Sequence, residues 1–378
     1  MKELTYTILR GENELTGNLI EIACGETKVL VECGKSIQEE STMLSAIEQR
    51  VLRTQYTAVV ISHIHADHCG LASLIDKDIP VYMGNLSLSL FKLNARDKDY
   101  SNFRIFYDGV PFYVGGIRIT PYRCNHSAPD SYMFLFERKY NSILYTGDFR
   151  APNQKMFANL LERLPQTVEV LITENTNAFA QESMPTESEI RQALNAFVAQ
   201  ADKPVFVLCA TTNIDRIVGV YKASARAGRD MLVDITQERV LETIGGSVPN
   251  AKDFSKVKIY NKRECIPPDL SHKYLDIRTV AAMNNYTMLV RTSSQAYLQS
   301  LVAEGADLFG ANLVYSMWEG YQEKPDMQSF LSAIETMGIK VVTIHASGHA
   351  RPQDVQRLIS RLCPHQIVYV HTPTNDEI

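Results

Sequence analysis

The chain has 378 residues, of which 45% are hydrophobic and 21% are charged, the proportions of an ordinary globular protein. This composition excludes global disorder. At roughly 150 residues per domain, the length predicts two to three domains. The formal net charge of −5 argues against a protein that binds nucleic acid through bulk positive charge, although a local basic groove or a bound metal could hold phosphate.

Three further features of the sequence concern location. No apolar run reaches the roughly 18 residues that a membrane span requires, and the first residues lack the apolar stretch of a signal peptide. The seven cysteines are scattered without a Cys-x-x-Cys pair, so we interpret them as reduced thiols. We therefore expect a cytoplasmic protein without a membrane partner. Whether it forms a homo-oligomer stays open.

Strand patterns dominate the first part of the chain. Strands are predicted at 18–22, 28–32, 57–61, 111–121, 131–137, 142–146 and 168–173, and helices at 41–53 and 70–75. Thr186-x-x-Glu189 is typical of a helix start, and strands and helices alternate after it, which predicts a parallel sheet with crossover helices. The closing stretch returns to strand, helix and strand at 340–345, 351–362 and 366–370.

This change of rhythm predicts two domains. Residues 1–184 and 339–378 are expected to form a discontinuous first domain, and residues 185–338 an α/β domain inserted into it.

The strongest chemical signal is Ser62-His-Ile-His-Ala-Asp-His-Cys-Gly70, which follows an apolar strand. In an extended loop, His63 and His65 point the same way and can share one cation. Asp67 and His68, at the start of the following helix, can face a second cation. Imidazole and carboxylate suit zinc, manganese or iron, and two-metal hydrolytic sites use this ligand set. The alternative is a histidine-rich loop that arose by chance.

Two single residues extend this signal. His126 directly precedes a predicted strand, and Asp148 directly follows another, after Gly147. Glycine would allow the backbone to bring a carboxylate close to a metal. A lone histidine is more often a packed residue, and an aspartate after a strand is often a helix cap. Their order after the histidine-rich loop is what supports both as ligands.

The series His63-x-His65-x-Asp67-His68, His126 and Asp148 resembles the metallo-β-lactamase-fold hydrolases. Later motifs resemble the nuclease branch of that fold with an inserted β-CASP domain, close to ribonuclease J. These motifs are Glu174 in Thr173-Glu-Asn-Thr-Asn177, His349 in His345-Ala-Ser-Gly-His-Ala350, His371 in Val368-Tyr-Val-His-Thr372, and Thr211-Thr-Asn-Ile-Asp-Arg216. The fold class that the resemblance implies is α/β, an αββα sandwich with an inserted α/β domain.

The resemblance also implies two divalent metal ions, Zn²⁺ or alternatively Mn²⁺. The implied ligands are His63, His65 and His126 for one ion, Asp67, His68 and His371 for the other, and Asp148 as a bridge between them.

Further roles come from the same resemblance. The implied catalytic residues are Asp67, His349 and Glu174. His349 would contact the scissile phosphate or protonate the leaving oxygen, and Glu174 would orient a ligand histidine or its loop. The implied substrate contacts are Ser347, Gly348 and Asn213.

The chain departs from the family pattern in several places. Glu32 stands at the end of an early strand where the family has aspartate. His371 is followed by Thr-Pro, where the family has glycine after the histidine. The sequence printed here stops seven residues after His371, so we expect the C-terminal domain of ribonuclease J to be absent.

The function predicted from these residues is a two-metal phosphodiesterase that acts on RNA, as an exonuclease or endonuclease. One alternative is a hydrolase of a small ester, lactone or nucleotide, since the fold hosts many substrates. A second is a non-catalytic nucleic-acid-binding member of the fold. The basic residues Arg216, Lys222, Arg226 and Arg229 could follow a phosphate backbone, although a solvated helix face is the commoner reason for such charges.

Overall fold

The computed structural model describes residues 3–36, 43–93, 98–179, 184–260 and 266–373. It divides into two compact units, one formed by Met1–Met184 and Gly348–Ile378 and the other by Pro185–Ser347. Each unit is described by itself. In the described part of the chain, no helix has the length and apolar character that a membrane crossing needs.

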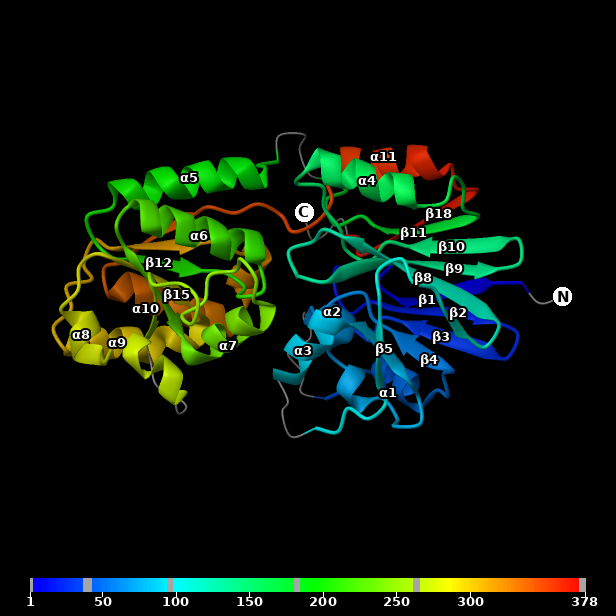
Figure 1. Ribbon diagram of the computed structural model, residues 1–378, viewed down its shortest axis with the longest axis horizontal. Coiled ribbons are helices and arrows are strands. Elements are labelled where there is room, and N and C mark those ends of the chain that lie inside the picture. Colours follow the sequence, from blue (N-terminus) through cyan, green and yellow to red (C-terminus); the bar gives the residue numbers. More distant parts are fainter. Residues whose placement is uncertain (1–2, 37–42, 94–97, 180–183, 261–265, 374–378) are drawn as a thin grey trace. The chain divides into compact units, whose positions relative to one another are not determined.

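The first unit contains two six-stranded sheets (Figure 1). The first sheet has the order β1 (Thr5–Arg10), β2 (Leu19–Cys24), β3 (Thr27–Val31), β4 (Ala58–Val60), β5 (Val81–Gly84) and β6 (Phe103–Phe106). The second has the order β18 (Gln366–Val370), β11 (Val170–Glu174), β10 (Asn141–Tyr145), β9 (Ser131–Arg138), β8 (Ile117–Cys124) and β7 (Phe112–Val114).

These sheets form the middle layers of a four-layer sandwich. One buried cluster, which includes Ile22, Val60, Phe134 and Ile172, joins the inner faces of the two sheets. Two further clusters pack helices on the outer faces. The helices of this unit are α1 (Ala46–Arg53), α2 (Ala66–Cys69), the 3-10 turn η1 (Ala72–Leu74), α3 (Asn85–Leu93), α4 (Gln154–Arg163) and α11 (Pro352–Leu362).

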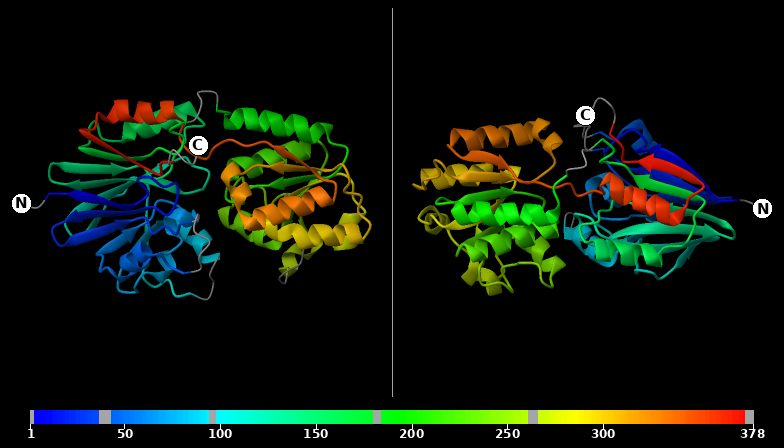
Figure 2. Two further views of the ribbon diagram at one scale, coloured as in Figure 1. Left: turned by 180° about the vertical axis from the view of Figure 1, so that it is seen from behind. Right: turned by 90° about the horizontal axis from the view of Figure 1, so that it is seen from above.

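In its described residues, the second unit contains one sheet, and its six strands all run parallel. Its order is β14 (Val257–Tyr260), β13 (Asp230–Asp234), β15 (Tyr286–Val290), β12 (Val205–Leu208), β16 (Asn312–Tyr315) and β17 (Lys340–Thr343). Its helices are α5 (Glu187–Gln200), α6 (Ile214–Arg226), α7 (Ile235–Ile244), η2 (Pro268–Lys273), α8 (Ile277–Ala281), η3 (Thr292–Ser294), α9 (Gln295–Ala303), η4 (Glu319–Glu323) and α10 (Pro325–Thr336). Figure 2 shows helices on both faces of this sheet.

The αββα sandwich and the separate α/β unit confirm the predicted fold class. The chain returns to the first unit at Gly348 instead of at residue 339. The reason is that β17 pairs with β16 as the edge strand of the parallel sheet. The alternation of strand and helix did not reveal this, because an edge strand has the same local pattern in either domain.

Two predicted helices differ from the structure. The segment 70–75 is not one helix, because α2 ends at Cys69 with Gly70 as its C-cap, and the short turn η1 follows. The helix predicted over 41–53 begins at Ala46, with Ser45 as its N-cap in a capping box with Glu48. Residues 41 and 42 lie outside the described part of the chain.

Candidate metal centre

The histidine-rich loop joins the central strand β4 to α2. His63 and His68 are fully buried, while His65 and Asp67 are partly exposed. Backbone hydrogen bonds hold the loop against the end of β3: the Cys33 N–H donates to the His68 carbonyl at 2.7 Å. The loop is therefore anchored at both ends, which suits side chains that must be held in position for a metal.

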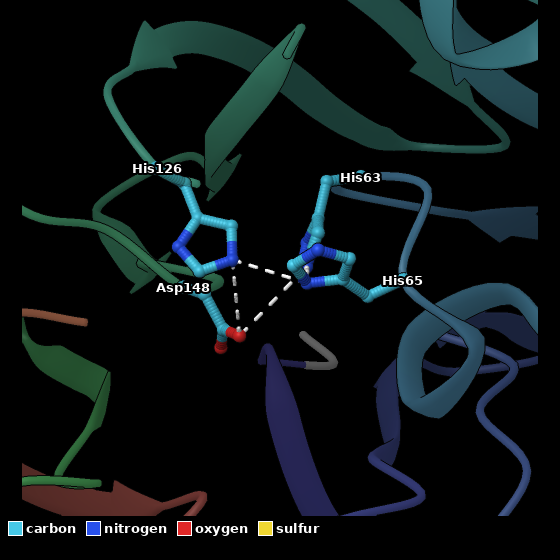
Figure 3. A group of neighbouring side chains, drawn as sticks. All are labelled: His63, His65, His126 and Asp148. Carbon is cyan, nitrogen blue, oxygen red and sulfur yellow. Dashed lines mark hydrogen bonds and ion pairs between the residues drawn. The ribbon is translucent and has the colours of Figure 1, made fainter. Parts of the chain in front are cut away.

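His126 and Asp148 reach the same place from the second sheet. His126 follows β8 and Asp148 follows β10, and both are buried. Gly147 has a left-handed φ of 53°, and a Cβ there would lie 2.9 Å from Cβ of Ser62, so only glycine fits. Figure 3 shows how His126 and Asp148 face His63 and His65.

The clearest sign of a metal centre is one oxygen of Asp148. Oδ2 is buried and has no hydrogen-bond partner among the described residues. It nevertheless lies between 3.2 and 3.8 Å from ring nitrogens of five histidines, namely His63, His68, His126, His349 and His371. Buried polar atoms are normally satisfied, so an oxygen surrounded by nitrogens without a hydrogen bond fits a ligand that bridges cations.

The ligand atoms fall into overlapping groups, within each of which they all lie within 4.8 Å of one another. The groups are His63, His65, His126 and Asp148; Asp67, His68 and His371; and Asp148, His349 and His371. The seven residues that the sequence analysis named as ligands thus converge, and the third group adds His349. Nitrogen and carboxylate donors in this number are compatible with Zn²⁺, and also with Mn²⁺.

Carboxylates and imidazoles shift one another's proton affinity here. Burial would raise the pKa of Asp148, but His371 and His68 hold it well below its ordinary value. Burial, together with neighbouring histidines, lowers the pKa of His63 well below its ordinary value. The carboxylate is therefore held ionised and the His63 ring neutral, which are the protonation states that metal ligands need.

Glu32 supports one of these rings from behind. It is fully buried, and its Oε1 lies 3.2 Å from Nδ1 of His68, while its Oε2 accepts from the Ser62 N–H at 3.1 Å. Its backbone adopts a left-handed φ of 64°. A carboxylate on Nδ1 leaves Nε2 of His68 facing the centre. Glutamate thus reaches His68, one of the expected ligands, at the position where the family pattern has aspartate.

Glu174 and Thr176 connect the two histidines near the C-terminus to the centre. Oε2 of Glu174 lies 3.0 Å from Nδ1 of His349 and accepts from the Thr176 hydroxyl at 2.9 Å. The same hydroxyl oxygen lies 3.2 Å from Nδ1 of His349 and 3.0 Å from Nδ1 of His371. Burial alone would lower the pKa of His349, but Glu174 and Asp148 raise it to about 9.

Comparisons with known proteins agree with this geometry. The family model described as "Beta-lactamase superfamily domain" matches residues 27–208. Ribonuclease J 2 of Streptococcus pyogenes is 23% identical over 412 aligned positions, which cover all of this chain and 71% of that protein. The ribonuclease J proteins of Mycobacterium tuberculosis and Helicobacter pylori are each 25% identical, over 97% and 98% of this chain and 68% and 56% of their own length.

The chain is a metallo-β-lactamase superfamily protein, distantly related to ribonuclease J. It spans between 56% and 71% of the length of these relatives. A crystal structure from Enterococcus faecalis, described as a protein of unknown function, has the same fold with a TM-score of 0.79 and 18% identity, over all of this chain and 96% of that one. The His/Asp cluster is typical of the two-metal centre of this superfamily.

The residues expected to contact substrate have other partners in the structure. The Gly348 carbonyl lies 2.8 Å from Nδ1 of His126, and a Cβ at this glycine would lie 2.7 Å from Oγ of Ser127. Asn213 is the N-cap of α6, and its side chain accepts from the Arg216 N–H. Ser347 is the last residue of the second unit. Substrate contact stays a prediction for all three.

Thr176 belongs to this site but was not predicted from the sequence. The residue lies in the quoted segment Thr173-Glu-Asn-Thr-Asn177, but a hydroxyl gives no metal-ligand signal of its own. Asn18 was missed as well, and its Nδ2 lies 3.3 Å from Nε2 of His68. Nothing local indicates it, because the contact spans 50 positions.

Proposed function

We propose that this chain is a two-metal phosphodiesterase whose substrate is RNA. The observation that carries the proposal is the buried Oδ2 of Asp148, which lies within 4 Å of ring nitrogens from both expected ligand sets. The ribonuclease J name of the relatives supports RNA as the substrate class.

Two divalent cations would be held by the seven ligands predicted from the sequence. When bound, such a pair lowers the pKa of water and neutralises charge on the phosphoryl oxygens. Zn²⁺ is the expected ion, because its usual ligands are imidazole and carboxylate, and Mn²⁺ is the alternative.

His349 is the group best placed to act on the substrate itself. Its side chain is 20% exposed, whereas those of His63, His68 and His126 are fully buried and that of His371 is 6% exposed. Glu174 holds Nδ1, so that Nε2 can contact a phosphate oxygen or give a proton to the leaving oxygen. Asp67, with Oδ2 3.1 Å from Nε2 of His371, would orient the attacking water.

An activity screen tests the proposal. End-labelled RNA, single-stranded DNA, a chromogenic phosphodiester, a lactone and a carboxylic ester are each incubated with the protein and Zn²⁺ or Mn²⁺. We expect cleavage of RNA, with a product ladder that reveals whether the cut is internal or terminal. Turnover of the lactone or ester alone would replace this proposal with the small-substrate alternative, and binding of RNA without turnover would favour a non-catalytic protein.

A further inference from the structure

A basic groove lies between α5 and α6 of the second unit, and no residue of the metal centre lines it. The two helices pack side by side on one face of the parallel sheet (Figure 1). The groove has a volume of about 230 Å³, and we call it the α5–α6 groove. Its lining includes Ser188, Arg191 and Asn195 from α5 and Gly219, Lys222 and Arg226 from α6.

Only part of the basic run noted in the sequence contributes to this groove. Arg216 is fully buried and donates to the Ile344 carbonyl and to Ser316, and Arg229 donates to backbone carbonyls that include Tyr286. Both are structural residues, so they do not belong to a phosphate-binding surface. Lys222 and Arg226 remain, and Arg191 joins them from the neighbouring helix.

Three cations therefore converge on one groove from two helices. None of them forms an ion pair with a carboxylate in the described part of the chain, and no carboxylate lines the groove. Gly219 lies where the helices approach closely, since a Cβ there would be 3.4 Å from Cγ of Arg191. A solvated helix face would usually intersperse acidic partners among such cations.

The floor of the groove adds a second observation. Oδ1 of Asn195 is buried and has no hydrogen-bond partner among the described residues. A buried amide oxygen without a partner is costly, by about 1–3 kcal/mol, unless a ligand or water supplies a donor. The groove thus combines three cationic side chains with one buried amide oxygen to which a ligand or a water molecule could donate a hydrogen bond.

We propose that the α5–α6 groove binds the sugar–phosphate backbone of an RNA strand. Arg191, Lys222 and Arg226 contact phosphates, and Asn195 accepts a hydrogen bond from a ribose 2′-hydroxyl, which DNA lacks. The inference rests on the proposed RNA substrate. It adds a binding site on the second unit, formed by residues that do not belong to the metal centre.

The test compares two triple variants of the full chain, each with three charges removed. The groove variant is Arg191→Gln, Lys222→Gln and Arg226→Gln. The control variant removes three exposed cations elsewhere on the same unit, Lys256→Gln, Arg278→Gln and Lys340→Gln. Binding of a labelled phosphorothioate RNA of 20 nucleotides is measured by fluorescence anisotropy at several salt concentrations, with the metal-loaded protein.

We expect the groove variant to bind RNA at least tenfold more weakly than the control variant. Each neutralised phosphate on a single strand contributes about 0.7 to the slope of log K against log salt, so the slope should fall by roughly 2. Equal affinity and equal slope for the two variants would overturn the proposal. Binding of inorganic phosphate is measured for the same variants. If the groove variant loses phosphate binding to the same extent as RNA binding, the proposal is overturned in favour of a small-anion site.

Asn195→Ala examines the hydroxyl contact. It should weaken RNA binding severalfold and leave binding of a DNA strand of the same sequence unchanged. An equal loss for both strands would contradict the role given to Asn195.

Turnover separates this inference from the proposed function. The groove variant should hydrolyse a small chromogenic phosphodiester at the wild-type rate, because no groove residue belongs to the metal centre. If the wild-type protein cleaves RNA and the groove variant still binds RNA normally, the groove proposal alone is defeated. A wild-type protein that neither binds nor cleaves RNA would defeat both.

Discussion

Oε2 of Glu174 lies 3.0 Å from Nδ1 of His349, although 175 positions separate the two residues. The other carboxylate oxygen accepts from the N–H groups of Phe149, at 2.6 Å, and Ala350, at 3.4 Å. One buried side chain therefore joins the end of β11, the loop that carries Asp148, and the segment before α11. This arrangement makes Glu174 both a structural link and a positioning residue for His349.

The first prediction separates these two roles of Glu174. Glu174→Ala leaves two buried N–H groups without an acceptor, which should cost roughly 2–4 kcal/mol of unfolding free energy. Glu174→Gln keeps an acceptor oxygen and should stay within about 1 kcal/mol of wild type, yet turn over 10–100-fold more slowly because His349 is less well held. Chemical denaturation and kcat measurements check both, and a Gln variant with full turnover would contradict the positioning role.

A second prediction concerns metal content. His65→Ala should lose metal and activity together while the fold survives, because the ligand loop lies outside the apolar strands. His365→Ala is the control, since this exposed histidine lies outside the metal centre. Elemental analysis and circular dichroism provide the readouts. At most trace metal in the reconstituted wild-type protein would defeat the two-metal centre itself.

The two C-terminal histidines should respond differently to substitution. His349→Ala should retain both metals and slow the chemical step by about 10²-fold or more if the ring is the general acid. His371→Ala should weaken one metal selectively, because its Nε2 lies 3.1 Å from Oδ2 of Asp67. Metal content and single-turnover rates of both variants decide the matter. Loss of metal from His349→Ala alone would reverse the assigned roles.

Gly147 should tolerate no side chain. In Gly147→Ala, the left-handed φ should lower the unfolding free energy by roughly 1–2 kcal/mol. The overlap of the new Cβ with Ser62 should lower it by roughly a further 1–3 kcal/mol. Gly228→Ala is a matched control, since that glycine also has a positive φ, of 72°, but nothing lies within 4 Å of its Cβ position. Denaturation midpoints should fall further for position 147, and metal affinity should fall there only. Equal midpoints would contradict the predicted overlap.

Stability should depend on pH through Glu238. Burial raises the pKa of this carboxyl from 4.5 to about 7 in the folded protein. Between these values the folded state binds more protons than the unfolded state, so stability falls as pH rises from about 4.5 to about 7. In Glu238→Gln, this fall in unfolding free energy, on the order of 1–3 kcal/mol, should be absent. Glu335→Gln is the control: Glu335 is exposed, so the fall should persist in that variant. Denaturation at pH 5 and pH 8 provides the measurement.

The sequence by itself was enough to predict which residues converge at the candidate centre and most of the elements that carry them. The motif His63-x-His65-x-Asp67-His68 directly follows a buried strand. Residues directly after a strand lie at the end of that strand, whatever the order of the strands in the sheet is. The alternation after Thr186 also predicted a parallel sheet, because strand and helix periodicities are local properties of the chain.

Only the tertiary structure decided which distant groups meet. The contacts of Nδ1 of His126 with the Gly348 carbonyl and of Thr176 with both His349 and His371 span more than 170 positions. The burial of Arg216 and the membership of β17 in the parallel sheet of the second unit were decided in the same way. Such contacts depend on strand order and packing, which bring together residues whose local patterns carry no information about each other.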